Sequence, residues 1–330
     1  MYDLRGFSMM YEGDPPDEER QGILADVAEL YYSQGLNQNQ IARTMGVDRS
    51  TVSRMLADAR RLKIVEVSVH HPLISNPELE SRLERTFDLL KAIVITDRGE
   101  DPAQLLTRLG SATAKYLKSL FVPDMTVGLS WGTAVSAVVD AIEPNPHLSM
   151  KVVQLVGALG SENKVYDGHG LLQRLAQKFN SQTYFLNAPF LVKEPQTALA
   201  LENTPSIQTV IDLAKRCDLA IVGIGSLEAD SSSFYQAGYV SAEDFLALQQ
   251  QALVGDICGR HFTITGDIPD NDFHNRIIAI KPQDLRCVPL RVAVAGGEHK
   301  VLPILGALRS GLANALVTSE NTALRVLENL

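Results

Sequence analysis

The chain has 330 residues, a formal net charge of −9 and 45% hydrophobic residues. This length accommodates a small domain beside one of roughly 240–260 residues. The sequence contains neither a long uninterrupted apolar run nor a signal-peptide pattern, which excludes a membrane-spanning helix and favours a cytoplasmic protein without a membrane partner. The three cysteines (Cys217, Cys258 and Cys287) lie far apart, as is typical of reduced thiols; a redox sensor among them is the alternative.

The first twenty residues are rich in acid and proline and lack a helical or strand period, so we expect residues 1–20 to form a mobile acidic tail. Between residues 22 and 34 apolar side chains recur at helical spacing, and Gly35 follows where a helix commonly ends. This segment predicts a supporting helix for the stretch that comes after it.

Residues 36–63 have the pattern of two short helices joined by a tight turn. Asn37 is placed to cap the first helix, with Gln40 three residues later to return the hydrogen bond. Gly46 permits the left-handed turn that ends this helix, and Asp48 is placed to cap the next one. Two capped helices at this spacing predict a helix-turn-helix within a DNA-binding domain of residues 21–70.

The second helix of this pair has the polar and basic residues of a recognition helix. Residues 36–63 contain six basic and two acidic side chains, a local balance of +4 in an acidic chain. Such a positive island is what contact with DNA phosphates requires. A helical hairpin with a solvated basic face is the alternative. The residues that we expect to contact double-stranded DNA are Gln38, Arg49, Ser50, Thr51, Ser53, Arg54, Arg60 and Lys63.

After the recognition helix the sequence changes to an alternating pattern. Residues 64–69 alternate as a strand does, which predicts the wing of a winged helix-turn-helix. A linker over residues 71–77 is expected next. The adjacent His70 and His71 could suggest a metal site, but no further ligand has a useful spacing, so we interpret them as a solvated hinge and expect no metal.

From residue 78 onward, short apolar strands alternate with helices. This order predicts an α/β domain of residues 78–330, with a mainly parallel, Rossmann-like sheet covered on both faces. The predicted strands are 92–96, 126–129, 152–156, 183–186, 219–224, 277–280, 292–295 and 316–318. The predicted helices are 78–87, 102–120, 133–142, 170–179, 207–217, 303–310 and a closing helix.

Glycine-rich segments follow four of these strands, at residues 129–133, 156–161, 223–226 and 295–300. Ligands in parallel sheets bind beyond the carboxyl ends of the strands, and a helix that begins there attracts anions. Glycine is also common in such turns for steric reasons alone, so one loop is weak evidence and four are stronger. None matches the dinucleotide fingerprint or the phosphate-binding P-loop, so we expect no nucleotide cofactor.

The chain resembles the SorC-type sugar-responsive transcriptional regulators of bacteria over nearly its whole length, from about residue 22. The resemblance is carried by the helix-turn-helix stretch of residues 37–69 and by later blocks at 127–135, 152–160, 219–227, 254–262 and 292–318. It implies a winged helix-turn-helix domain followed by an effector domain similar in fold to sugar-phosphate isomerases. It also implies a sugar effector, often phosphorylated, and a homo-oligomer that is a dimer of dimers.

Residues matching the family's effector site follow from this resemblance. Ser130, Gly132 and Thr133 match the family's anion-binding turn. Asp256 and Lys300 match polar positions that face the sugar. The full set of residues that we expect to bind the effector is Ser130, Trp131, Gly132, Thr133, Gln154, Gly157, Gly225, Asp256, Glu298 and Lys300. Two departures concern the phosphate: Ala134 replaces a common second hydroxyl, and residues 302–303 replace a glutamate-alanine pair.

Alternatives remain for single residues and for the protein. Asp256 could be a turn residue, Lys300 a surface lysine, and Trp131 a packing residue over its turn. The main competing function is an isomerase- or deaminase-like enzyme with an appended DNA-binding domain, because a lysine in a pocket can form a Schiff base, with Glu298 or Asp256 as its acid/base partner. Since no complete catalytic set is present, we expect a regulator without catalysis. A purely architectural DNA-binding protein would leave the four strand-end loops unexplained.

Overall fold

The computed structural model describes residues 17–65, 74–158, 168–228 and 240–330. The chain divides into two compact units, residues 1–72 and residues 73–330. Among the described residues, no helix is long and apolar enough to cross a membrane.

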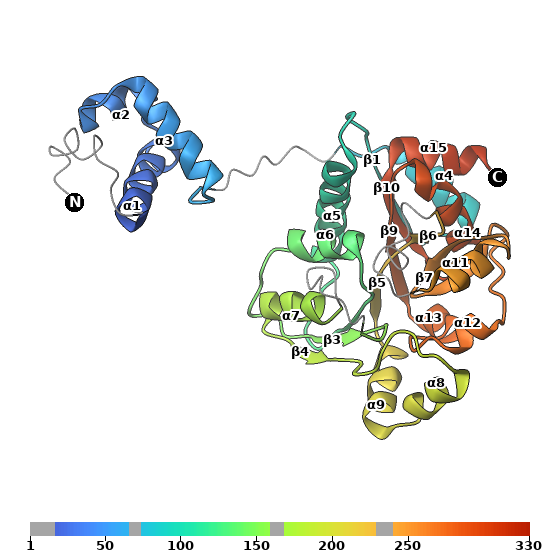
Figure 1. Ribbon diagram of the computed structural model, residues 1–330. Coiled ribbons are helices and arrows are strands. Elements are labelled where there is room, and N and C mark those ends of the chain that lie inside the picture. The colour runs from blue at the N-terminus through green and yellow to red at the C-terminus, as the bar shows by residue number, and fades with distance from the viewer. Residues whose placement is uncertain (1–16, 66–73, 159–167, 229–239) are drawn as a thin grey trace. The chain divides into compact units, whose positions relative to one another are not determined.

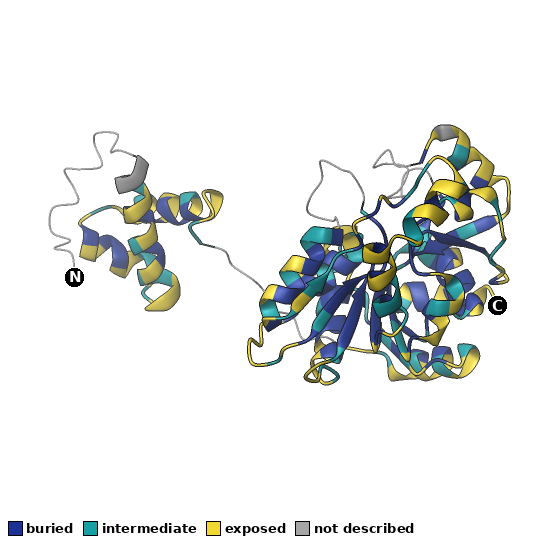
Figure 2. Cartoon of the chain, turned by 90° about the horizontal axis from the view of Figure 1, so that it is seen from below, coloured by how far each residue is buried: buried dark blue, intermediate teal, exposed yellow. Residues whose placement is uncertain are grey.

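The small unit consists of a helical core of α1 (Asp17–Ala28), the π-helical turn η2 (Glu29–Ser33), α2 (Gln38–Met45) and α3 (Arg49–Arg61) (Figure 1). Apolar side chains at helical spacing on α1, α2 and α3 meet in one buried cluster. Figure 2 shows this cluster as the dark inner faces of the helices. The predicted supporting helix therefore exists, and it begins at Asp17, inside the stretch that we expected to be a tail up to residue 20.

We call the small unit the reader. The N-termini of its helices α2 and α3 are capped in different ways. Asn37 and Gln40 form the predicted capping box, with Gln40 N donating to Asn37 Oδ1 at 3.0 Å and Asn37 N donating to Gln40 Oε1 at 2.9 Å. Gly46 adopts the left-handed conformation at φ 69°, as expected. The predicted side-chain cap by Asp48 is wrong: Asp48 is the N-cap residue, but only its backbone carbonyl accepts hydrogen bonds from the helix.

The predicted wing lies largely outside the described residues. Of residues 64–69 the structure describes Ile64 and Val65, which belong to no strand. Both backbone N–H groups donate to the carbonyl of Ala59, so these two residues close the end of α3 as a turn.

The large unit is built on a seven-stranded sheet in the order β1-β10-β9-β5-β2-β3-β4. Every pairing in this sheet is parallel, which confirms the predicted class of sheet. The strands are β1 (Lys91–Ile95), β2 (Thr126–Leu129), β3 (Lys151–Gln154), β4 (Gln182–Tyr184), β5 (Leu219–Gly223), β9 (Leu290–Val294) and β10 (Ala315–Ser319).

Helices cover both faces of this sheet (Figure 1). One face packs against α5 (Pro102–Lys118), α6 (Thr133–Ala141) and α7 (Gly168–Phe179). The other face packs against α4 (Pro77–Phe87), α8 (Pro195–Glu202), α9 (Pro205–Ala214), α11 (Ala242–Gln249), α13 (Pro282–Cys287), α14 (Val301–Ser310) and α15 (Glu320–Glu328). Side chains along each central strand alternate between the two buried clusters. Both faces are therefore apolar, and the strands read as continuous apolar runs.

A second, antiparallel sheet was not predicted. It consists of β6 (Gly225–Ser226), β7 (Leu253–Ile257) and β8 (Arg260–Thr263), in that order. The turn between β7 and β8 is Cys258-Gly259, at φ 54° and 75°. Two successive left-handed residues are what a two-residue hairpin requires, but cysteine is an unusual first residue for it. The sequence therefore did not indicate a hairpin here.

Two other expectations about the large unit need correction. Residues 277–280 form isolated bridges to other loops and no strand. The predicted linker of residues 71–77 ends earlier, because residues 74–76 are hydrogen-bonded along β1. Asn76 then caps α4 and donates to Glu320 Oε1 at 2.7 Å. These residues belong to the large unit.

Candidate functional site

The recognition helix α3 has one buried and one exposed face. Val52, Met55, Leu56 and Ala59 are buried in the reader's core at helical spacing. The remaining positions of α3 bring Arg49, Ser50, Ser53, Arg54 and Arg60 to the exposed surface, with Thr51 half-buried. Lys63, two residues beyond the end of the helix, is exposed as well. The predicted DNA-contacting side chains are therefore accessible, and those of the first two turns lie on one short segment.

Hydrogen bonds orient the side chains at the start of α3. Arg49 Nε donates to Gln38 Oε1 at 3.2 Å, and Arg54 Nη2 lies 3.5 Å from Thr51 Oγ1. Gln38, at the start of α2, thereby holds an arginine of the neighbouring helix. The first two turns of α3 present a preformed set of polar groups.

Not every basic residue of α3 is equally available. Arg61 Nη2 lies 3.0 Å from Asp58 Oδ1, and Arg20 Nη2 lies 3.3 Å from Asp58 Oδ2. The hydrogen bond from Arg61 lowers the pKa of the Asp58 carboxyl, with a smaller effect from Arg20. Asp58 thus partly neutralises the positive charge of residues 36–63. Lys63 forms no ion pair with any described residue.

The four glycine-rich loops follow four neighbouring strands of the sheet. β9, β5, β2 and β3 are adjacent and parallel, so their carboxyl ends lie along one edge. The chain continues from β2 to α6 on one face and from β9 to α14 on the other. Such a reversal is where parallel sheets bind ligands. We call this segment of the sheet the effector edge. Residues 159–161 of the second loop lie outside the described residues.

The first loop of the effector edge is a turn into a helix N-terminus. The buried Ser130 Oγ accepts a hydrogen bond of 3.3 Å from Gly223 N and so ties the ends of β2 and β5 together. Gly132 has φ 118°, a conformation that favours glycine, and Thr133 is exposed at the start of α6. Trp131 is half-buried and packs against both apolar clusters.

Gln154 and Gly157 have structural surroundings. The Gln154 side chain is buried, donates to Val156 O at 2.7 Å and accepts from Leu186 N at 3.2 Å. A Cβ on Gly157 would lie 2.7 Å from Pro189 O, so backbone segments pack directly against it. The side chain of Glu298 is exposed and forms an ion pair with Arg325. Gln154 and Glu298 therefore already have partners within the protein, and Gly157 serves close backbone packing.

Asp256, Gly225 and Lys300 do lie together at the effector edge. Asp256 of β7 is opposite Gly225 of β6, and a Cβ on Gly225 would lie 1.8 Å from Asp256 Oδ1. Lys300 Nζ, from the end of the 3-10 turn η3 (Glu298–Lys300), donates to Ile224 O at 2.8 Å. Only glycine at position 225 leaves room for this carboxylate.

Burial determines the charge state of this pair. It raises the pKa of Asp256 to about 6, although the hydrogen bond from Gly259 N and the charge of Lys300 act in the opposite direction. It lowers the pKa of Lys300 to about 8, against the charges of Asp256 and Glu228. Sequence reasoning missed Glu228. The one feature of the sequence that points to Glu228 is its position, two residues after the third glycine-rich loop. The arrangement offers a carboxylate and an ammonium group to a polar ligand.

Comparisons with known proteins agree with this architecture. Residues 71–328 match the model of a family described as "Putative sugar-binding domain". The chain is 30% identical to the deoxyribonucleoside regulator of Bacillus subtilis over 95% of this chain and 100% of that protein. It is also 30% identical to the sorbitol operon regulator of Klebsiella pneumoniae, over 91% and 96% of the two chains. The crystal structure of full-length SorC from Klebsiella pneumoniae superposes with a TM-score of 0.70 at 27% identity, covering 94% of this chain and 99% of that one.

A helix-turn-helix reader joined to a parallel α/β domain of this type defines a transcriptional regulator with a sugar-binding domain. The chain belongs to the SorC family of such regulators. This confirms the fold class and the kind of function predicted from the sequence.

Proposed function

We propose that the protein reads an operator in double-stranded DNA through α3 and controls a carbohydrate or polyol catabolic operon in the cytoplasm. The exposed polar face of α3 supports this assignment, because the core-facing residues leave Arg49 and Arg54 at the surface. Side chains on the first turns of a recognition helix contact base edges, and those at its far end contact phosphates. Arg54→Ala should relax specificity by about 1–3 kcal/mol at one base pair.

The effector is a sugar that binds at the effector edge, with its phosphate, where present, at the turn before α6. This proposal rests on one observation: Asp256, Lys300 and Gly225 lie close together beyond the carboxyl ends of the strands. A carboxylate and an ammonium group suit the hydroxyls of a sugar, and the exposed N–H groups at the start of α6 suit an anion. Thr133 adds a hydroxyl beside them.

Effector binding changes operator affinity through linkage between the two sites. A typical coupling of about 1–3 kcal/mol corresponds to a change of roughly 5–150-fold, and operator must change sugar affinity by the same factor. The test begins with an operator obtained by selection from random DNA. Its affinity is then titrated with 2-deoxyribose, sorbitol and their phosphates, compounds suggested by the relatives' names.

Matched variants separate a binding defect from a folding defect. Thr133→Ala and Lys300→Ala should abolish the sugar response and leave sugar-free operator binding nearly unchanged. Thr209→Ala and Lys118→Ala remove exposed side chains elsewhere on the large unit and should respond as wild type. A normal response in both site variants would contradict the proposed site. Loss of sugar-free DNA binding in both would mark the two residues as structural.

We also propose that the protein binds its sugar effector without catalysing a reaction of it. Lys300 has the lowered pKa that Schiff-base chemistry uses, which keeps a sugar-phosphate isomerase or deaminase as the second candidate. Glu298, one of the two acid/base partners considered for it, is instead paired with Arg325. Incubation of the purified protein with sugar phosphates should return them unchanged. Turnover that is lost in Lys300→Ala would favour the enzyme.

Operator recognition also requires assembly. One reader contacts a short DNA segment, so two readers on a two-fold axis are needed for two half-sites. We propose a homo-oligomer, a dimer of dimers formed through the large unit. Sedimentation should show this assembly at micromolar concentration; a monomer both with and without operator would contradict it.

A further inference from the structure

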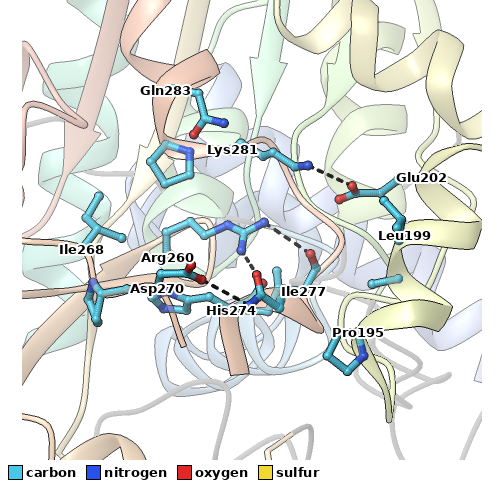
Figure 3. Close-up of a pocket in the computed structure, with 14 residues that line it drawn as sticks. Pro195, Leu199, Glu202, Arg260, Ile268, Asp270, His274, Ile277, Lys281 and Gln283 are labelled. Atoms are coloured by element: carbon cyan, nitrogen blue, oxygen red, sulfur yellow. Dashed lines mark hydrogen bonds and ion pairs between the residues drawn. The ribbon is translucent and has the colours of Figure 1, made fainter. Parts of the chain in front are cut away.

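A pocket of about 540 Å³ is lined by none of the predicted effector residues. Its walls come from α8, from β8, from residues 268–270, from α12 (Asp272–Asn275) with Ile277, and from the start of α13 (Figure 3). Volumes of this size are common for small-molecule sites. Apolar walls and a few polar groups make it a candidate ligand site.

Arg260 is the buried cation of this pocket. Only 6% of the residue is exposed. Its Nη1 donates to His274 O at 2.6 Å and its Nη2 to Ile277 O at 3.3 Å, while its Nε–H has no hydrogen-bond partner among the described residues. No carboxylate in the described part of the chain forms an ion pair with it. A buried guanidinium without a counter-ion is costly. Nη1 and Nη2 each have a second hydrogen, and this pair of donors matches a bound carboxylate.

The other charges of the pocket compensate Arg260 only in part. The charge of Glu202 stabilises the Arg260 cation, but Glu202 forms its ion pair with Lys281. Lys281 Nζ lies 3.1 Å from Glu202 Oε2, and the two opposite charges of this ion pair leave no net charge between them (Figure 3). Asp270 is exposed, where water screens its charge. His274 is neutral, because its Nε2 accepts a hydrogen bond of 3.0 Å from His261 N while Nδ1 faces Pro269 O at 2.8 Å. One buried positive charge is left.

We propose that this pocket is a second ligand site, which binds a small monocarboxylate with its carboxylate on Arg260 and its carbon body against Leu199 and Ile268. Arg260, Lys281 and Glu202 together have a net charge of one, which matches one negative charge, and a phosphate dianion would exceed it. Burial lowers the pKa of Arg260 from its usual value, and the nearby charge of Glu202 counteracts this. A bound carboxylate would stabilise the same cation more directly.

Pairs of acids and their amides test the proposal, because each amide keeps the shape and loses the charge. Lactate, benzoate and gluconate are titrated into the full-length protein by calorimetry, each beside its amide, and inorganic phosphate is added as the dianion. At least one acid should bind and should raise the unfolding temperature of the large unit, whereas its amide and phosphate should not. Failure of all three acids, or equal binding of an acid and its amide, overturns the proposal.

Two exposed leucines provide a matched pair of variants. Leu199, at the pocket, and Leu246, on α11, are 58% and 57% exposed. Leu199→Glu places a like charge beside the bound acid and should weaken it by at least about tenfold, while Leu246→Glu should bind as wild type. Arg260→Gln should also lose binding, with circular dichroism to check its fold. Unchanged affinity in Leu199→Glu contradicts the site, and loss confined to Lys300→Ala would place the acid at the effector edge instead.

Discussion

The reader and the effector edge use charged residues in opposite ways. The basic side chains of α3 are exposed on a helix whose caps and core lie within residues 17–65. Asp256 and Lys300 are far apart in the sequence and are brought together by the sheet and its hairpin, with Asp256 buried and Lys300 half-buried. The first arrangement leaves charges in water until DNA arrives. The second keeps them partly desolvated in the absence of ligand.

This difference determines what a substitution does. An exposed side chain that makes few intramolecular contacts can be removed with little change in stability, so its loss is visible in binding. A buried group is also part of the packing, and its loss changes stability and binding together. We therefore expect the effector edge to give the larger effects on unfolding.

The largest expected effect is that of Gly225→Ala. The new Cβ would lie 1.8 Å from Asp256 Oδ1, and that carboxylate is buried and held by Gly259 N at 2.9 Å. Displacing it should lower the unfolding free energy of the large unit by about 3 kcal/mol, as overpacking of a buried site does. Denaturant unfolding measures the change.

The reader supplies the control for this glycine. Gly22 lies inside α1, and nothing lies within 4 Å of a Cβ built on it. Gly22→Ala should stabilise the reader by about 0.5–1 kcal/mol through helix propensity. Tolerance of alanine at both positions would show that the Asp256 carboxylate is free to move.

The second prediction concerns pH and Asp256. The pKa of this carboxyl is about 6 in the folded protein, above its ordinary value of 3.8. A raised pKa means that the folded state binds the proton more tightly, so its stabilising contribution is complete below pH 3.8 and is lost as pH rises through about 6. Asp256→Asn, which cannot ionise, should therefore gain stability relative to wild type over this interval, by on the order of 2 kcal/mol. The two unfolding free energies are compared across the pH range. A difference independent of pH would show that Asp256 is not desolvated.

What the sequence predicted well is local. The capping box of Asn37 and Gln40, the left-handed Gly46 and the apolar stripe of α3 follow from residues within four positions of each other. The parallel sheet followed from strands with continuous apolar runs, because both faces are covered.

What the sequence did not predict depends on distant segments or on turns with unusual residues. The Cys258-Gly259 hairpin lacks the common turn residues. Without this hairpin nothing placed Asp256 opposite Gly225, or Arg260 in a pocket with Lys281. Position 256 entered the expected site through the family resemblance alone. The glutamine at 154 had the right polarity for a ligand, but its buried amide is used by the backbone.

The third prediction compares the two helix caps of the reader. Asn37→Ala removes a capping box with two hydrogen bonds and should destabilise the reader by about 1 kcal/mol. Asp48 makes no such side-chain bond, so Asp48→Ala should cost no more than a few tenths of a kcal/mol. Thermal unfolding of the reader, followed by its helical signal, distinguishes the two. Equal losses would mean that Asp48 caps α3 in solution.

The smallest expected effect concerns two basic residues near the end of α3. A side chain that binds a phosphate releases counter-ions, and its removal lowers the slope of log affinity against log salt by about 1. Lys63 is exposed, and Arg61 is held by Asp58 at 3.0 Å. Lys63→Ala should therefore lower the slope by about 1, with equal losses for operator and random DNA. Arg61→Ala should lower it by less, because its charge is already partly neutralised before DNA binds. Asp58→Asn, measured alone and combined with Arg61→Ala, provides the check: releasing Arg61 should steepen the salt dependence, and the double variant should not. If Arg61→Ala and Lys63→Ala give equal slopes, DNA displaces Asp58, and the ion pair does not restrict the contact surface of α3.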